Sequence, residues 1–138
     1  MKSLQINYLA VLTAAVATFI LGAIWYIGFS VPWMELTSLT EEKIATSGGG
    51  ASSFIISFTT YLLAAYAMAI IFKSMNISTI KTGTMTGALI GALIVGGNIF
   101  TNNACEMKPL GLSILNAGFS AVSGAVVGAI LGGWKKYV

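Results

Sequence analysis

The chain has 138 residues, of which 57% are hydrophobic and only 8% are charged. A soluble domain has roughly 25% charged residues, so this composition predicts a single domain that lies in a lipid bilayer. The charged residues are seven lysines and four glutamates, which give a formal net charge of +3, and the sequence has neither histidine nor arginine.

The missing residue types exclude several classes of function. Without histidine there is no imidazole general base, no His metal site and no Ser-His-Asp triad. Without arginine there is no bidentate fork for phosphate, and the dispersed lysines do not form a nucleic-acid surface. One cysteine, Cys105, and scattered glutamates offer no metal-ligand set and no intrachain disulfide. We therefore expect no enzymatic activity, no cofactor, no metal and no nucleic-acid partner.

Four apolar runs are each long enough to cross a membrane, since a spanning helix needs roughly 20 residues. They cover residues 7–29, 51–73, 80–101 and 110–134. The first run is longer than the roughly 7–15-residue core of a cleavable signal peptide and ends in the aromatic pair Trp25-Tyr26. We therefore expect it to be retained as a helix. The links after the second and third runs are short, which predicts that sequential helices are antiparallel neighbours.

The long polar connection of the chain, residues 30–50, follows the first run. Within it, Val31-Pro32-Trp33 predicts a bend followed by an interfacial anchor. Thr40 is suited to cap a short helix whose first residues, Glu41-Glu42, complement the positive helix end. Residues 47–50 predict a flexible joint. The expected fold is an all-α, antiparallel bundle of four transmembrane helices with a short interfacial helix in the first external loop.

The placement of charge predicts the orientation. With four spans, both termini and the middle link lie on one side, which carries five lysines and no acid: Lys2, Lys73, Lys81, Lys135 and Lys136. The other side carries all four glutamates and two lysines: Glu35, Glu41, Glu42, Glu106, Lys43 and Lys108. Because positive loops stay inside, we expect both termini to be cytoplasmic and the protein to lie in the inner (plasma) membrane.

Small residues recur at every fourth position in the last two runs. In the third run they form two neighbouring lines, Gly83, Gly87, Gly91 and Ala88, Ala92, Gly96, and in the fourth run one line, Ser120, Gly124, Gly128, Gly132. Such lines let helix backbones approach closely. One interpretation is that the third helix packs on the fourth in the same chain. The other is that one line of the third helix faces another subunit.

A group of uncharged polar residues and one acid is predicted to lie at the external end. Asn98 and Asn102 share a helix face, Asn103 and Glu106 follow in the turn, and Asn116 lies about two turns into the fourth helix. A polar stripe and an aromatic pair reach the same depth: Ser113, Asn116, Ser120, Ser123, Trp25 and Tyr26. The asparagines could form interhelical hydrogen bonds, each worth about 0.6 kcal/mol in lipid. They could instead line a small polar cavity with Glu106 at its mouth.

Short motifs follow one another along nearly the whole chain. They are Asn7-Tyr8-Leu9-Ala10, Leu21-Gly22-Ala23-Ile24-Trp25-Tyr26, Trp33-Met34, Leu39-Thr40-Glu41-Glu42, Asn102-Asn103 with Glu106, Leu115-Asn116-Ala117-Gly118-Phe119 and Gly128-Ala129-Ile130-Leu131-Gly132. In this order they resemble a bacterial membrane family known as domain of unknown function 1761. The resemblance implies a small four-helix inner-membrane protein without an established activity. The link around Cys105 departs from the aromatic-rich turn of that family.

Two function hypotheses follow. The first is a membrane protein without enzymatic activity, either a homo-oligomer or an accessory subunit, which assembles through its glycine-lined helix faces. The second is a channel or transporter for a small solute with a polar site on the external side. No ionisable side chain lies firmly inside a span, which disfavours proton-coupled transport. In both cases the expected surroundings are the lipid bilayer and other membrane subunits.

Overall fold

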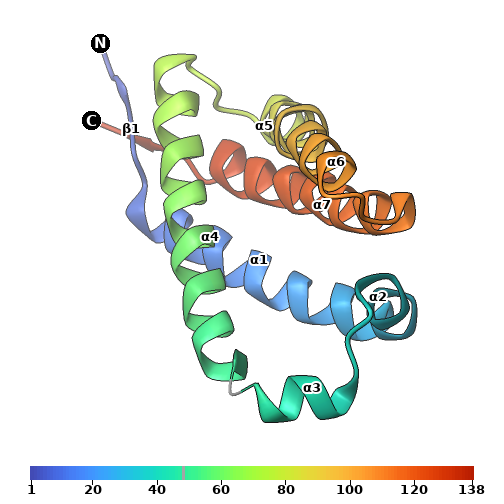
Figure 1. The fold of residues 1–138 in the computed structure, drawn as a ribbon. Coiled ribbons are helices and arrows are strands. Elements are labelled where there is room, and N and C mark those ends of the chain that lie inside the picture. The colour runs from blue at the N-terminus through green and yellow to red at the C-terminus, as the bar shows by residue number, and fades with distance from the viewer. Residues whose placement is uncertain (48) are drawn as a thin grey trace.

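The computed structural model describes residues 1–47 and 49–138, and it is almost entirely helical (Figure 1). Its long segments are α1 (Tyr8–Gly28), α4 (Gly49–Ser74), a third segment in three parts, and α7 (Leu110–Gly133). The third segment consists of α5 (Ile80–Leu89), the π-helix η1 (Ile90–Val95) and α6 (Gly96–Cys105). Within the described residues, four helices are long and apolar enough to cross a membrane. The predicted bundle of four transmembrane helices is confirmed.

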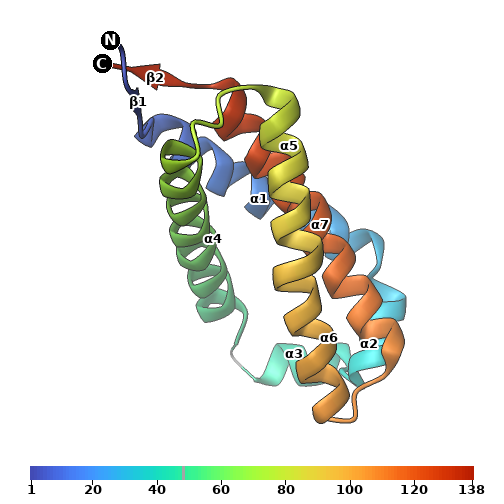
Figure 2. The same cartoon turned by 90° about the horizontal axis from the view of Figure 1, so that it is seen from above.

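The two termini meet at one end of the bundle. Two short strands that the sequence did not predict, β1 (Leu4–Gln5) and β2 (Lys136–Tyr137), pair antiparallel there. Asn7 caps α1 and also donates from Nδ2 to the carbonyl oxygen of Trp134 at 3.2 Å. Figure 2 shows this end, together with the α4–α5 link, opposite α2, α3 and the α6–α7 turn. We call the first the clasp end and the second the loop end.

Two short helices, α2 (Ser30–Thr37) and α3 (Glu41–Thr46), form the connection at the loop end. As expected, Thr40 caps α3, its Oγ1 accepting from the amide of Lys43 at 3.2 Å. The bend expected at Val31-Pro32-Trp33 is wrong, because the chain turns at Phe29 and these residues are helical. Pro32 lies in the first turn of α2, where a backbone N–H has no helical partner to lose. Of the expected joint, Gly48 lies outside the described residues, and α4 already begins at Gly49.

The third span is not one uniform α-helix. Its middle, Ile90–Val95, has π-helical hydrogen bonding, which links residues five apart instead of four. Across this π-helix, residues four positions apart no longer lie on the same face of the span. Residues after Val95 lie on faces different from those that an unbroken α-helix would give them.

The helices pack unevenly. The buried apolar cluster joins α1, α4 and α7 near the clasp end, with Ala14, Phe72 and Leu131 among its members. The α5–η1–α6 segment lies along α7 over its whole length, whereas α4 packs chiefly against α1 (Figure 2). In the hydrophobic window of α4 only 11% of the residues are buried, compared with 33% for α1 and for α7. The molecule thus has one tightly paired side and one loosely covered side.

Candidate functional sites

The glycine lines of the third and fourth spans face each other inside the chain. Gly83 lies against Gly128, Gly87 against Gly124, and Gly91 against Ser120. At each of these three glycines of α5 and η1, an added Cβ would come closer than 3.0 Å to the facing backbone oxygen. Gly132 makes the corresponding approach to the carbonyl oxygen of Thr79. The two backbones are therefore in contact, a spacing that only glycine permits.

The π-helix decides how this contact continues toward the loop end. Gly91 and Gly96 are five positions apart and both are buried, with Gly96 facing Ala117 of α7. An α-helix would rotate Gly96 off the face that Gly91 occupies. The extra residue in the turn corrects this rotation, so Gly96 joins the first glycine line. Ala92, expected on the same line as Gly96, is exposed instead.

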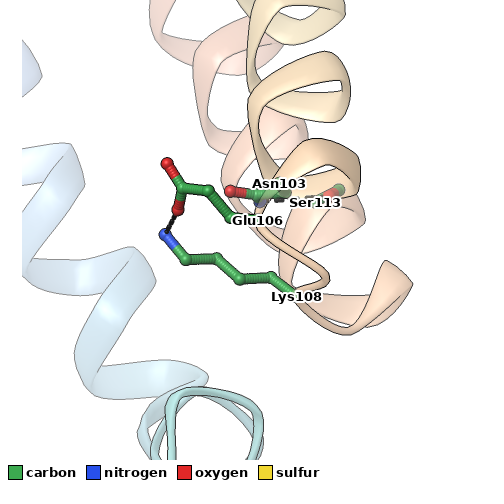
Figure 3. Close-up of polar contacts among 4 residues, drawn as sticks. All are labelled: Asn103, Glu106, Lys108 and Ser113. Atoms are coloured by element: carbon green, nitrogen blue, oxygen red, sulfur yellow. Dashed lines mark hydrogen bonds and ion pairs between the residues drawn. The ribbon is translucent and has the colours of Figure 1, made fainter.

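Beyond Gly96, a side-chain hydrogen bond joins the same two helices. Asn103 donates from Nδ2 to Ser113 Oγ at 3.0 Å, and both residues are buried (Figure 3). Close to them in the turn, Glu106 forms an ion pair with Lys108, in which both side chains are about half exposed. Glu106 is not among the described lining residues of either cavity below.

Asn116 has a different partner, on α1. Tyr26 donates its hydroxyl proton to Asn116 Oδ1 at 2.9 Å, and the contact is partly buried. Aromatic rings surround it, with Phe119 centred 5.5 Å from Tyr26 and 6.2 Å from Trp25. Trp25 Nε1 is buried and has no hydrogen-bond partner among the described residues. The hydroxyls of Ser120 and Ser123 bond carbonyl oxygens of their own helix.

Asn98 and Asn102 are not brought to the other asparagines. Both are exposed on α6, and the part of the chain that the structure describes gives their side chains no hydrogen-bond partner. Between them, Thr101 is exposed and donates to the carbonyl oxygen of Gly97, and an added Cβ at Gly97 would meet no described atom within 4 Å. We call these four residues, Gly97, Asn98, Thr101 and Asn102, the α6 outer face. The expected polar residues therefore occupy three separate places.

One cavity at the level of the membrane lies near the loop end, between α1, α4 and the short helices α2 and α3. Its volume is about 650 Å³, and we call it the α2 pocket. Five aromatic rings contribute to its lining: Phe19, Tyr26, Trp33, Phe54 and Tyr61. The described lining contains hydroxyl groups but no charged side chain.

A second cavity of about 420 Å³ lies where α4 leaves the α5–η1–α6 segment uncovered. Its hydroxyl-bearing members are Thr18, Thr60, Tyr61, Ser120 and Ser123, and the rest of the described lining is mostly apolar. Ile90, Gly91 and Val95 bring the π-helix to its wall. Tyr61 and the neighbouring ring of Phe119, 6.2 Å apart, stand between the two cavities.

Comparisons with known proteins agree with this architecture. The model of the family described as "Protein of unknown function (DUF1761)" matches residues 9–132, which run from the start of α1 to the end of α7. The chain belongs to this family. The match contains the four candidate spans almost entirely, so the family domain is the four-helix unit itself and the protein is a multi-pass membrane protein. Neither the curated proteins nor the solved structures yielded a match.

The α2 pocket is the feature that sequence reasoning missed. Its lining combines distant segments of α1 and α4 with α2 and α3, so spacing within one helix gives no sign of it. A weak signal was present. Trp33 and Met34 lie in a short helix beside the aromatic end of α1, and the second span has Phe54, Phe58 and Tyr61 near its beginning. Aromatic residues gathered at one membrane interface indicate an amphipathic site as well as an anchor.

Proposed function

We propose that this protein is a non-enzymatic membrane subunit that forms homo-oligomers through the α6 outer face. The observation that supports it is the exposure of Asn98 and Asn102 on a helix long and apolar enough to span a membrane. The glycine lines are not the assembly surface in this proposal, because Gly83, Gly87 and Gly91 already contact α7 in the same chain. The α6 outer face is a polar surface that stays open to a second copy.

The depth of the α6 outer face in the membrane makes its unpaired amides energetically unfavourable. Asn98 lies eight residues before Glu106, or about 12 Å along the helix, which places it within the hydrocarbon layer. An amide facing lipid without a hydrogen bond costs about 1–3 kcal/mol. An interhelical bond recovers about 0.6 kcal/mol or more. Four amides in a pair of chains therefore favour association.

The face is also suited to a second copy of the same chain. An asparagine amide is both donor and acceptor, so the same two side chains on two subunits can pair across a two-fold axis. Nothing on the face is charged, and Gly97 leaves room for a close backbone approach. We further propose that the lysine-rich clasp end is cytoplasmic, as the positive-inside rule requires. A C-terminal reporter that is active only outside the cytoplasm would contradict that orientation.

The test is the molar mass of the purified protein in detergent, measured by light scattering, together with energy transfer between labelled copies in vesicles. The double variant Asn98→Leu with Asn102→Leu should shift the protein to monomer at concentrations where the wild type is oligomeric. Met85→Leu, an exposed position on the same segment near the clasp end, is the matched control and should leave the mass unchanged. A monomeric wild type, or an oligomer that survives the double variant, would refute the proposal.

A channel for a small uncharged solute is the second candidate. The observation in its favour is again the α6 outer face, since several copies could arrange their Asn98 and Asn102 side chains around a common axis. The bonds of Asn103 to Ser113 and of Asn116 to Tyr26 weigh against a polar pathway inside one chain. Flux of glycerol or urea into proteoliposomes, lost in the same double variant, would favour the channel. Oligomers without flux would favour the purely structural role.

A further inference from the structure

We propose that the α2 pocket holds the acyl chain of one membrane phospholipid whose headgroup carries no net negative charge. Its volume of about 650 Å³ lies within the roughly 300–1,000 Å³ of sites for small ligands. Most of the lining is apolar, so an acyl chain is better suited to the pocket than ordered water, which needs several polar partners. In a bilayer, the apolar material that surrounds the pocket is lipid.

The dimensions of the pocket match one leaflet. Phe19, at the middle of α1, and Ile27, next to its end, are eight residues apart and both line the pocket. That separation is about 12 Å along the helix, close to the roughly 15 Å half-thickness of the hydrocarbon core. A chain lying beside α1 therefore extends from the interface to the middle of the membrane.

Aromatic contacts define the two ends of the pocket. Phe19 meets Phe54 and Phe58 edge-to-face with ring centroids 6.0 and 5.9 Å apart, which bounds one end of the pocket. At the other end Tyr26 meets Trp33 of α2 edge-to-face at 6.2 Å. The hydroxyl of Ser30 lies at this interfacial end, within reach of a glycerol or ester group.

The pocket has a lateral entrance. Ile27 is 75% exposed and Phe54 is 64% exposed, although both contribute to the lining. In Figure 1, α1 and α4 cross and then diverge toward the loop end, where α2 and α3 form the connection between them. A lipid can thus enter sideways from the bilayer, without passing through water.

The charges at the rim select the headgroup. Glu35 of α2 directly follows the lining residue Met34, and Glu41 and Glu42 of α3 shortly precede the lining residue Ile44. All three glutamates are exposed, and the nearest cation in sequence is Lys43. An anionic headgroup would meet a net negative rim, whereas a zwitterionic headgroup can place its cationic group against these carboxylates. This charge balance favours phosphatidylethanolamine or phosphatidylcholine over phosphatidylglycerol.

The test is native mass spectrometry of the full-length protein, released from micelles that contain phosphatidylethanolamine and phosphatidylglycerol in equal amounts. One phosphatidylethanolamine should remain bound per chain, at least tenfold more often than phosphatidylglycerol. Ala23→Phe, which fills the pocket, should reduce this retention at least tenfold. Ile24→Phe adds the same ring one residue away, at a position that is 65% exposed and outside the described lining, and should have no effect.

Further variants separate the components of the proposal. Ser57→Phe fills the pocket from α4, so it gives the same loss independently if Ala23→Phe unfolds the protein. Replacing Glu35, Glu41 and Glu42 with Gln should raise phosphatidylglycerol retention to that of phosphatidylethanolamine. Equal retention of both lipids by the wild type, or retention that both filling variants leave unchanged, would overturn the assignment. So would displacement of the phospholipid by an equimolar prenylquinone, which would identify a different occupant.

Discussion

The α5–α7 pair and the α1–α4 pair both belong to apolar spans but pack differently. Between α5 and α7 the glycines bring the backbones into contact and leave no space for a ligand. Along α1 and α4 the facing residues include Phe19, Phe58 and Tyr61, whose rings hold the helices apart and leave cavities on both sides. Lipid tails are as apolar as leucine, so membrane helices associate mainly through close van der Waals contact. The α5–α7 pair makes this contact, whereas the α1–α4 pair makes it only in part. We therefore expect ligand binding beside the α1–α4 pair, and we expect the α5–α7 contact to contribute more to the stability of the fold.

The largest expected effect on stability comes from adding a methyl group between α5 and α7. In Gly87→Ala the new Cβ would lie closer than 3.0 Å to the carbonyl oxygen of Gly124, so the two backbones must separate. We expect a loss of about 1–3 kcal/mol, the usual cost of overpacking, measured as unfolding of the detergent-solubilised protein by denaturant. At a dilution where the protein is monomeric, Gly97→Ala is the matched control on α6, because the added Cβ meets no described atom within 4 Å. It should be neutral, or stabilising by up to about 1 kcal/mol through helix propensity.

Equal effects of the two alanine variants would show that the helices do not approach as closely as the structure indicates. If Gly87→Ala also abolished lipid retention, the α5–α7 contact and the α2 pocket would be coupled. We expect retention to persist under conditions where the variant stays folded, because the α2 pocket has no lining residue from α5 or α7 among the described residues.

A smaller effect should come from the side-chain bond that continues the same interface. Asn103→Ala leaves buried Ser113 without its partner and should reduce the unfolding free energy by about 1–2 kcal/mol. Asn102→Ala, one residue earlier and exposed, removes no bond that the structure describes and should change stability by less than about 0.5 kcal/mol. The same denaturant titration, run on both variants at a dilution where the protein is monomeric, distinguishes them. A loss at Asn102 as large as that at Asn103 would place Asn102 at a buried contact and contradict the exposed α6 outer face.

The sequence predicted the features that depend on hydropathy and on glycine spacing. Fold class and span number depend on hydropathy, which acts residue by residue, and they were predicted. Pairing of the third helix with the fourth, one of two interpretations left open, depends on the four-residue spacing of Gly83, Gly87 and Gly91. That spacing is readable because only glycine fits where backbones touch.

The arrangement of the asparagines could not be derived in this way. The π-helix shifts the helical phase after Val95, so spacing did not reveal that Gly96 is buried while Asn98 faces outward. Nothing in the sequence IGALIV specifies a π-turn over an α-turn, because the choice depends on contacts with α7. Similarly, the pairing of Asn116 with Tyr26 depends on where α1 crosses α7. The strands β1 and β2 have two residues each, too few to show an alternating pattern.

The bond between Tyr26 and Asn116 joins the two halves and should give the smallest effect. Tyr26→Phe keeps the ring packed against Phe119 and removes only the hydroxyl that donates to Asn116 Oδ1. A hydrogen bond between membrane helices contributes about 0.6 kcal/mol on average, so we expect a loss near that size in the denaturant titration. Tyr8→Phe, on an exposed ring near the clasp end, is the control and should cause no measurable change.

Because Tyr26 also lines the α2 pocket, the same variant also tests how the pocket holds the lipid. Unchanged lipid retention in Tyr26→Phe would mean that the apolar walls hold the chain, whereas a parallel loss would mean that the hydroxyl and its asparagine partner set the pocket's shape.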